Sequence, residues 1–237
     1  MLMLKIIFSV FINSQLFMKI FIINFLLMIG FSFVANASLD TKETIKYLEG
    51  FRSYCYPDNW QISGGYGSQF LCKSGLRRLF KKHISREQAN AQLDKDYILF
   101  KNQVLNALQK LNQHYGYNSS YSQNKIEALA IATYQKGYGN MLRHDIFRFA
   151  LAHNLGGISD QVMMREFLKL SCVYSIDDKK YYMSYGLLAR HYATAKLFLG
   201  KVKTLAEFKE AKEDHLEISK HVATISKFCK SKNNGWF

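Results

Sequence analysis

The chain has 237 residues, of which 49% are hydrophobic, and its formal net charge at pH 7 is +14. This size predicts one domain of catalytic size with a substantial core, and it excludes two separate domains. The strong positive charge favours anionic polymers as binding partners.

Residues 1–37 have the three parts of a secretory signal peptide: a basic start, the apolar run 20–34 and small residues that flank a cleavage point. We expect cleavage after Ala37, and translation could begin at Met18. A membrane anchor is the alternative, because the residues before Met18 are also apolar. Polar residues break that combined run, however, and 20–34 alone is shorter than the roughly 20 residues that a spanning helix needs.

Export changes which anionic polymer is expected. The signal segment carries two lysines and no acid, so +12 of the formal charge stays with the mature chain. A secreted or periplasmic basic protein meets cell-wall polymer, lipopolysaccharide or anionic lipid more often than nucleic acid. We therefore expect no nucleic-acid partner, and contact with the membrane only through the signal peptide.

All four cysteines, Cys55, Cys72, Cys172 and Cys229, lie in the mature part of the chain. An even count in an oxidising compartment predicts two disulfides. Of the three possible connectivities, sequence proximity favours Cys55–Cys72 together with Cys172–Cys229. No pair has the CxxC spacing of a zinc or redox site, so we expect no metal and no cofactor.

The first helix of the mature chain is predicted to end near Glu49. Asp40 followed by Glu43 is a capping signature, and Gly50 is a stop signal. A carboxylate in the last turn faces the negative end of the helix dipole, and partial burial acts in the same direction. Both effects favour the protonated carboxyl that a general acid requires. From its position in the helix alone, however, Glu49 is more often an ordinary exposed glutamate than a catalytic acid.

Residues 51–71 are rich in aromatic residues and glycine and contain the only proline, which predicts short strands and turns. Asp58 lies nine residues after Glu49, and Ser63 directly precedes the turn Gly64-Gly65-Tyr66-Gly67. Two carboxylates and a hydroxyl near one glycine-rich turn indicate a hydrolytic site. The alternative is a plain β-hairpin with an aromatic face.

The chain from Ser85 onwards is predicted to be helical throughout. Ser85 and Gln88 form a capping box that opens a helix extending towards Leu108, and residues 125–136 are apolar on most sides, as in a buried central helix. Further amphipathic segments are 145–152, 160–170, 187–199 and 205–228. The predicted fold class is α+β and mainly helical, with a small lobe that contains a β-hairpin, a larger helical lobe, and a cleft between them.

Several motifs occur in a recognisable order between Thr41 and Gly200. They are Glu49-Gly50-x-Arg52, Asp58, Ser63-x-Gly65-Tyr66-Gly67, Ile84-Ser85 with Ala89, Glu127-Ala128-Leu129 through Gly137, and Gly186-Leu187-x-x-Arg190. In order and spacing they resemble the phage-type lysozymes, the family 24 glycoside hydrolases of T-even and lambdoid phage endolysins. The first motif is the most specific.

This resemblance implies a role for particular residues. Glu49 matches the family's general acid, Asp58 matches its second carboxylate, and Ser63 takes the place of a threonine that helps to position water. The substrate-binding residues that the resemblance implies are Gly65, Tyr66, Gly67, Gln135 and Arg190.

The chain also departs from the family pattern. The loop between Asp58 and Ser63 is one residue shorter, and Ser68 stands where a histidine is common. Gln135 replaces an asparagine, and His191 replaces a second arginine. These changes indicate a distant member whose activity, rate or preferred wall could differ. Ser63 keeps a hydroxyl that can bind water but lacks the methyl group that restricts the threonine rotamer.

The resemblance implies a secreted, bacteriolytic and antimicrobial muramidase that acts on peptidoglycan as a monomer. It would cut the β-1,4 bond between N-acetylmuramic acid and N-acetylglucosamine by general acid/base catalysis, and inversion is favoured over retention. The alternative is a non-catalytic, lysozyme-like basic protein that binds the wall or perturbs membranes. The sequence identifies no inhibitor or immunity protein.

The resemblance divides the mature chain into two parts. Residues 38–204 form the expected catalytic domain, and 205–237 form a basic helical extension beyond it. We expect this extension to pack on the domain. The alternative is a wall-contact element that ends in Trp236 and Phe237.

Overall fold

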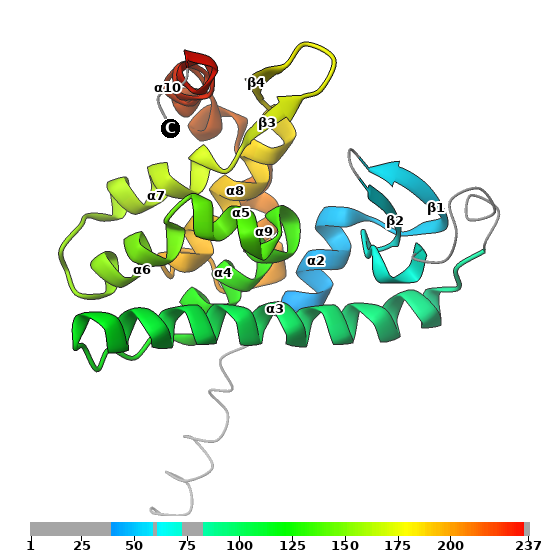
Figure 1. Cartoon of the computed structure of the whole chain (residues 1–237), viewed down its shortest axis with the longest axis horizontal. Coiled ribbons are helices and arrows are strands. Elements are labelled where there is room, and N and C mark those ends of the chain that lie inside the picture. Colours follow the sequence, from blue (N-terminus) through cyan, green and yellow to red (C-terminus); the bar gives the residue numbers. More distant parts are fainter. Residues whose placement is uncertain (1–38, 59–60, 73–82, 235–237) are drawn as a thin grey trace, which may run out of the picture. The chain divides into compact units, whose positions relative to one another are not determined.

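The computed structural model of the chain describes residues 39–58, 61–72 and 83–234, and Figure 1 labels their helices and strands. Two features predicted from the sequence lie outside the described residues: the signal peptide, and the terminal Trp236 and Phe237. In the part that the structure describes, no helix is both long and apolar enough to span a membrane.

The first described helix, α2 (Thr41–Glu49), begins and ends where its capping residues predict. The Asp40 carboxylate accepts hydrogen bonds from the backbone N–H groups of Lys42 and Glu43, at 3.0 and 3.1 Å. Gly50 ends the helix with a φ of +66°, a conformation that favours glycine. Glu49 is therefore the last helical residue, as predicted.

A small β-hairpin follows α2. Strand β1 (Arg52–Asp58) pairs antiparallel with β2 (Gln61–Gly65), and Tyr56 lies opposite Ser63. The short helix η1 (Phe70–Cys72) packs against β2, and the predicted disulfide Cys55–Cys72 ties it to β1. These elements form the small lobe.

Gly64 is required where the small lobe packs beneath this disulfide. A Cβ at Gly64 would lie 2.4 Å from Cδ1 of Ile84 and 2.8 Å from Sγ of Cys72. Contacts this short would force the hairpin away from the disulfide. The glycine therefore allows the close approach that the Cys55–Cys72 bond needs.

Helix α3 (Arg86–Tyr115) connects the small lobe to the rest of the fold. Its 30 residues span about 45 Å, and it runs beneath both lobes in Figure 1. The Ser85–Gln88 capping box opens the helix as predicted, and Gly116 closes it in the left-handed conformation. The last helical residue, Tyr115, lies seven positions beyond the predicted Leu108. The helix contacts β2 and η1 near its start and α4 and α6 further along.

The helical lobe is built around α4 (Gln123–Lys136), in which every residue from 127 to 133 is buried. It packs against α3 on one side and against α8 on another, which confirms the predicted buried central helix. The other helices of this lobe are α5 (Tyr138–Arg143), α6 (Ile146–Asn154), α7 (Asp160–Lys169) and α8 (Tyr185–Phe198).

A second hairpin interrupts the region that the sequence predicted to be helical throughout, and that prediction was wrong here. Strands β3 (Cys172–Ser175) and β4 (Lys180–Met183) pair antiparallel between α7 and α8. Val173 lies opposite Tyr182, and such β-branched and aromatic cross-strand pairs favour strands. Lys179, with a φ of +54°, adopts the left-handed conformation at the turn.

The C-terminal residues form two helices rather than one. Asp214 separates α9 (Leu205–Glu213) from α10 (His215–Ser231) and caps the second helix by accepting a hydrogen bond from the Glu217 N–H. A short helix, η3 (Lys232–Asn234), follows. The separation has a local cause, because an aspartate favours a helix N-terminus over a helix interior.

Both C-terminal helices pack onto the rest of the fold. Phe208 of α9 is fully buried in the main core. Ile218, Ile225 and Cys229 of α10 are buried in a second cluster, together with residues of α7 and α8. The predicted disulfide Cys172–Cys229 joins β3 to α10.

Candidate active site

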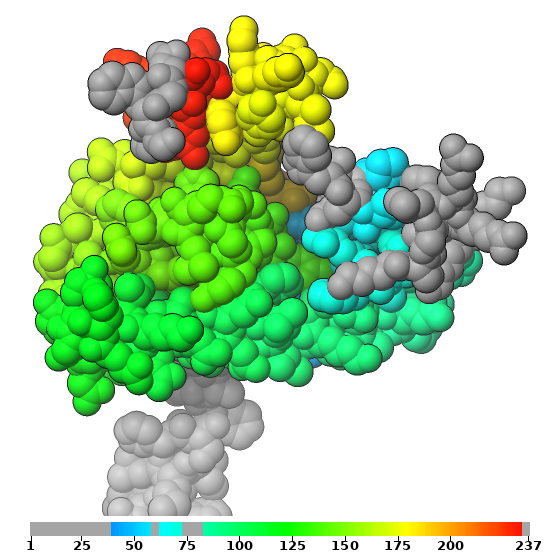
Figure 2. Space-filling model, viewed as in Figure 1, coloured from blue at the N-terminus to red at the C-terminus, as the bar shows by residue number. Residues whose placement is uncertain are grey.

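A cavity of about 600 Å³ lies between the small lobe and the helical lobe. Figure 2 shows this face hollowed between the cyan and the green parts of the surface. Its walls come from the end of α2, the turn after β2, the middle of α3, and the junction of α4 with α5. The lining residues are Glu49, Gly67, Ser68, Gln69, Phe70, Asp96, Leu99, Phe100, Gln103, Tyr134, Gln135, Lys136, Gly137, Tyr138 and Asn140.

Glu49 projects into this cavity from the end of α2, and its side chain is 20% exposed. Nη1 of Arg190 donates a hydrogen bond to its Oε1 at 3.2 Å, and Nε2 of Gln135 approaches the same oxygen at 3.5 Å. Arg190 thus supplies positive charge close to the C-terminus of α2, where the helix dipole is negative. The carboxylate is held by side chains from two other helices.

The turn after β2 passes close to the Glu49 carboxylate. Gly67 has a φ of +86°, and a Cβ built on it would lie 3.7 Å from Oε2 of Glu49. A side chain here would be strained by the backbone conformation and would also narrow the space beside the carboxylate. The glycine-rich turn therefore keeps this side of Glu49 open.

Gly65 and Tyr66, two of the predicted binding residues, form the framework behind that turn. A Cβ on Gly65 would lie 2.8 Å from Leu71 and 3.0 Å from Ala89, because β2 packs closely on α3 there. Tyr66 is buried, and its carbonyl oxygen accepts a 2.5 Å hydrogen bond from the Tyr134 hydroxyl. Neither residue is among those that line the cavity.

The predicted catalytic residues Asp58 and Ser63 belong to the small hairpin. Ser63 is fully buried on β2 and is not among the described residues that line the cavity. Asp58 ends β1 opposite Gln61, and its side chain lies outside the described part of the structure. The catalytic roles of both residues therefore stay predictions.

Two cavity residues that sequence reasoning missed are Tyr134 and Asp96. Burial raises the pKa of Tyr134, and the charges of Asp96, Glu49 and Tyr56 raise it further, so its hydroxyl remains a hydrogen-bond donor. Asp96 on α3 is only 3% exposed and accepts a 2.7 Å hydrogen bond from Gln92. Asp96 is a buried acid in a helix whose residues are of mixed polarity. Only the packing of α3 in the fold brings it to the cavity, so the sequence did not indicate this position.

His191, which departs from the family pattern, lies in the core behind Arg190. It is fully buried, and its Nδ1 lies 3.1 Å from the Ser171 hydroxyl. Burial lowers its pKa, and the charges of Lys136, Arg190 and His144 act in the same direction. A neutral buried imidazole at this position packs α8 and does not reach the cavity.

Among the described residues, no group of three or more histidine, cysteine, aspartate or glutamate side chains is arranged to hold a metal ion.

Comparison with known protein families shows to which family this chain belongs. The model of the Phage lysozyme family matches residues 46–180, which is more than half of the chain. The chain belongs to the phage lysozyme family. It is accordingly a glycosidase of the lysozyme type, and Glu49, Asp58 and Ser63 all lie within the matched segment.

Solved structures share the phage lysozyme fold with this chain. The muramidase domain of SpmX from Asticaccaulis excentricus is 21% identical, with a TM-score of 0.52, over 67% of this chain and 94% of that one. An endolysin from Escherichia coli O157:H7 phage FAHEc1 is 24% identical, with a TM-score of 0.54, over 69% of this chain and 92% of that one. These likenesses confirm the predicted α+β, mainly helical, lysozyme-like fold. No curated protein matches the sequence significantly.

Proposed function

We propose that this member of the phage lysozyme family is an exported muramidase that cleaves the β-1,4 bond between N-acetylmuramic acid and N-acetylglucosamine in peptidoglycan. One observation carries the proposal: the Glu49 carboxylate opens into the cavity between the lobes and is held there by Arg190 and Gln135. A cleft between two lobes is a suitable place for a polymer chain.

The proposed reaction begins with proton transfer from Glu49 to the glycosidic oxygen. The sugar then passes through an oxocarbenium-like state, and glycosidases use a second carboxylate to stabilise it or to activate water. Once Glu49 has given up its proton it becomes a carboxylate, and Arg190 lies 3.2 Å away to stabilise that charge. Arg190 already contacts Glu49 before the reaction, and it would stabilise the carboxylate that proton transfer leaves.

We propose that Asp58 and Ser63 activate and position the attacking water molecule. The strand register places Asp58 at the tip of the hairpin and Ser63 five positions later on the paired strand. In an inverting enzyme, a water molecule on the face opposite Glu49 attacks the sugar, activated by the second carboxylate. Ser63 would contribute through the hydroxyl that it shares with threonine.

The predicted export is supported by the described cysteines, since all four are paired in disulfides. Disulfides persist in oxidising compartments outside the cytosol. The mature chain would then meet the wall carrying a formal charge of +12, which favours approach to an anionic polymer. We propose that peptidoglycan is the partner and that the site works without a cofactor.

Replacement of Glu49 by glutamine tests the proposal. Glu49→Gln keeps the shape of the side chain but has no proton of suitable acidity, so we expect it to abolish the release of reducing ends from purified peptidoglycan. Circular dichroism should show an unchanged fold. Glu43→Gln is the matched control, because Glu43 lies on the same helix, pairs with Lys46 on the surface and does not line the cavity.

Two results would contradict this function. Undiminished wall lysis by folded Glu49→Gln would remove Glu49 from the chemistry. An unmodified protein that sediments with the wall but releases no reducing ends would be a wall-binding protein with a lysozyme fold. Product analysis during the same assay would also show whether the anomeric configuration is inverted or retained.

A further inference from the structure

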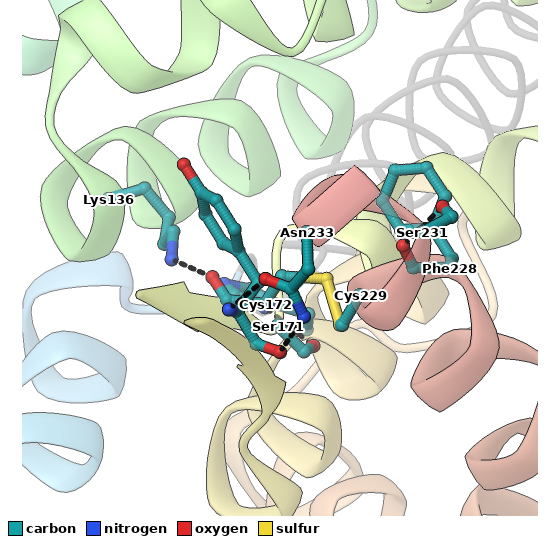
Figure 3. The surroundings of a disulfide bond; sticks show 9 residues. Lys136, Ser171, Cys172, Phe228, Cys229, Ser231 and Asn233 are labelled. Carbon is teal, nitrogen blue, oxygen red and sulfur yellow. Dashed lines mark hydrogen bonds between the residues drawn. A yellow bond between two sulfur atoms is a disulfide. The ribbon is translucent and has the colours of Figure 1, made fainter. Parts of the chain in front are cut away.

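Lys136 is a positively charged residue in the wall of the candidate active site. It is the last residue of α4, directly after Gln135, and it lines the same cavity as Glu49. Figure 3 shows its ammonium group pointing to the carbonyl oxygen of Cys172. That hydrogen bond is 3.3 Å long, which is at the weak end of the usual range.

Lys136 differs from Lys101 and Lys169, two other half-buried lysines, in what it contacts. Lys101 pairs with Glu127 at 2.7 Å, and Lys169 pairs with Glu166 at 2.7 Å. Lys136 forms no ion pair with any carboxylate among the residues that the structure describes, and its hydrogen-bond acceptor is an uncharged carbonyl. A half-buried cation without an anion is unfavourable unless a ligand supplies one.

The groups around Lys136 are also basic. Burial lowers its pKa to about 8, and the charge of Lys232 acts in the same direction. Lys136 in turn lowers the pKa of His144 and of His191. Among the described residues, the only charge that acts on the pKa of Lys136 is thus a basic one, and an anionic ligand would be favoured at this end of the cavity.

The contact that orients Lys136 is held from behind by the C-terminal segment. The Cys172–Cys229 disulfide ties the start of β3 to α10, and Figure 3 shows both residues beside the Lys136 contact. The Asn233 side chain bonds the backbone of Tyr181 on β4 through both its oxygen and its nitrogen. The hairpin that presents the Cys172 carbonyl is therefore anchored at both strands.

We infer that Lys136 binds a carboxylate of the glycan substrate and so selects glycans that carry acidic groups. This inference rests on the proposed function. Muramic acid carries a lactyl group that N-acetylglucosamine lacks, and its carboxylate is either free or joined to a peptide that has carboxylates of its own. A muramyl unit bound beside Glu49 would bring one of these carboxylates to the same cavity.

Because no described carboxylate pairs with Lys136, one substitution should change stability and substrate binding in opposite directions. Lys136→Met removes a half-buried charge while keeping most of the aliphatic volume, so we expect a higher melting temperature. The same change removes the binding group, so we expect weaker substrate binding. A purely structural lysine would lose stability and binding together.

Binding is best measured in a Glu49→Gln background, where the substrate is not consumed. We expect addition of Lys136→Met to raise the Kd for muramic-acid-containing strands about tenfold or more, and to leave the Kd for N-acetylglucosamine oligomers unchanged. Lys125→Met is the matched control, because Lys125 is a partly buried lysine of the same helix that contacts neutral Asn154 and does not line the cavity. It should leave both Kd values unchanged.

Two soluble preparations separate the sources of the carboxylate. Strands with intact peptides carry peptide carboxylates but no free lactyl group, whereas strands stripped of peptide by an amidase expose the lactyl carboxylate. A Lys136 effect confined to the first preparation assigns the peptide, and one confined to the second assigns the lactyl group. Conversion of the carboxylates to amides should remove the effect in either case.

The inference would be overturned by an equal loss of binding on amidated strands or on N-acetylglucosamine oligomers, or by no loss on either muramyl preparation. Lys136→Gln, measured in parallel, covers the case in which the methionine variant does not fold. The binding measurement does not depend on turnover. If the unmodified protein released no reducing ends, the proposed muramidase function would be refuted, but the Kd values would still test the role of Lys136.

Discussion

Arg190 on α8 donates a hydrogen bond to Glu49 at the end of α2, across 3.2 Å and 141 positions of the sequence. Gln135 on α4 approaches the same oxygen. Three helices therefore meet at one carboxyl group, which fixes its direction into the cavity. Because this ion pair is partly exposed, its value lies in orientation more than in stability.

Replacement of Arg190 should slow turnover more than it weakens binding. Arg190→Met removes the charge that would stabilise the Glu49 carboxylate after proton transfer, so we expect kcat to fall about 100-fold, the lower end of the range for the loss of one charge-stabilising donor. Arg190→Lys should recover part of the rate. The measurement is kcat and KM on soluble peptidoglycan strands, and an unchanged kcat in Arg190→Met would exclude this role.

Ser63→Ala tests the predicted water-positioning residue. We expect a lower kcat with little change in KM, because a hydroxyl that orients water acts in the chemical step. Ser63→Thr should retain activity, since it restores the side chain that the family commonly has at this position. Ser63 is fully buried, so the melting temperature of each variant must be compared with that of the unmodified protein. Full turnover by a folded alanine variant would remove Ser63 from the site.

The two disulfides should contribute unequally to stability. Cys172–Cys229 joins residues 57 positions apart, and Cys55–Cys72 joins residues 17 positions apart. The chain-entropy model then gives about 4 kcal/mol for the longer loop and about 3 kcal/mol for the shorter one. Denaturant unfolding of the paired serine variants would measure both. A larger loss from the shorter loop would show that local packing outweighs chain entropy here.

The C-terminal helices are predicted to be needed for stability. Phe208 is fully buried against the main core, and Phe→Ala changes at such sites cost about 3–5 kcal/mol. Phe208→Ala should lower the free energy of unfolding by about this amount, and truncation after Gly200 should destabilise the domain. A truncated chain that stays stable but no longer binds the wall would instead support the contact role of residues 205–237.

Acidification should destabilise the protein partly through His144. Burial lowers the pKa of His144 from 6.5 to about 4. Between these two values the unfolded chain binds a proton that the folded chain does not, so the free energy of unfolding falls as the pH drops from about 6.5 towards 4. The positive groups that lower this pKa along with burial are Lys232, Lys136, Arg143 and Lys169.

Replacement of the imidazole provides the check on this pH dependence. His144→Gln cannot titrate, so its free energy of unfolding should depend less steeply on pH over the same interval. Urea unfolding at several pH values would show the difference. An identical slope in the two proteins would assign the acid sensitivity to other groups, of which His191 is the next candidate because burial also lowers its pKa.

Local chemistry in the sequence determined much of this protein. Asp40 and Gly50 place Glu49 at a helix end, because a side-chain cap and a positive φ depend on neighbouring residues alone. The Ser85–Gln88 box opens α3 for the same reason. Sequence proximity was enough to pair Cys55 with Cys72, and the remaining pair then followed.

Only the tertiary structure decided what surrounds Glu49. The sequence predicted Arg190 as a substrate-binding residue but gave no sign of its contact with the Glu49 carboxylate, which depends on the packing of α8 against α4. The sequence did not single out Lys136, which ends a helix that was predicted to be buried. Its proposed role depends on the hairpin that begins at Cys172, 36 positions further along the chain. Contacts between residues so far apart in the sequence depend on how helices pack, which local sequence patterns do not encode. The sequence therefore predicted Glu49 as a candidate catalytic residue, but it did not predict the charged residues around Glu49.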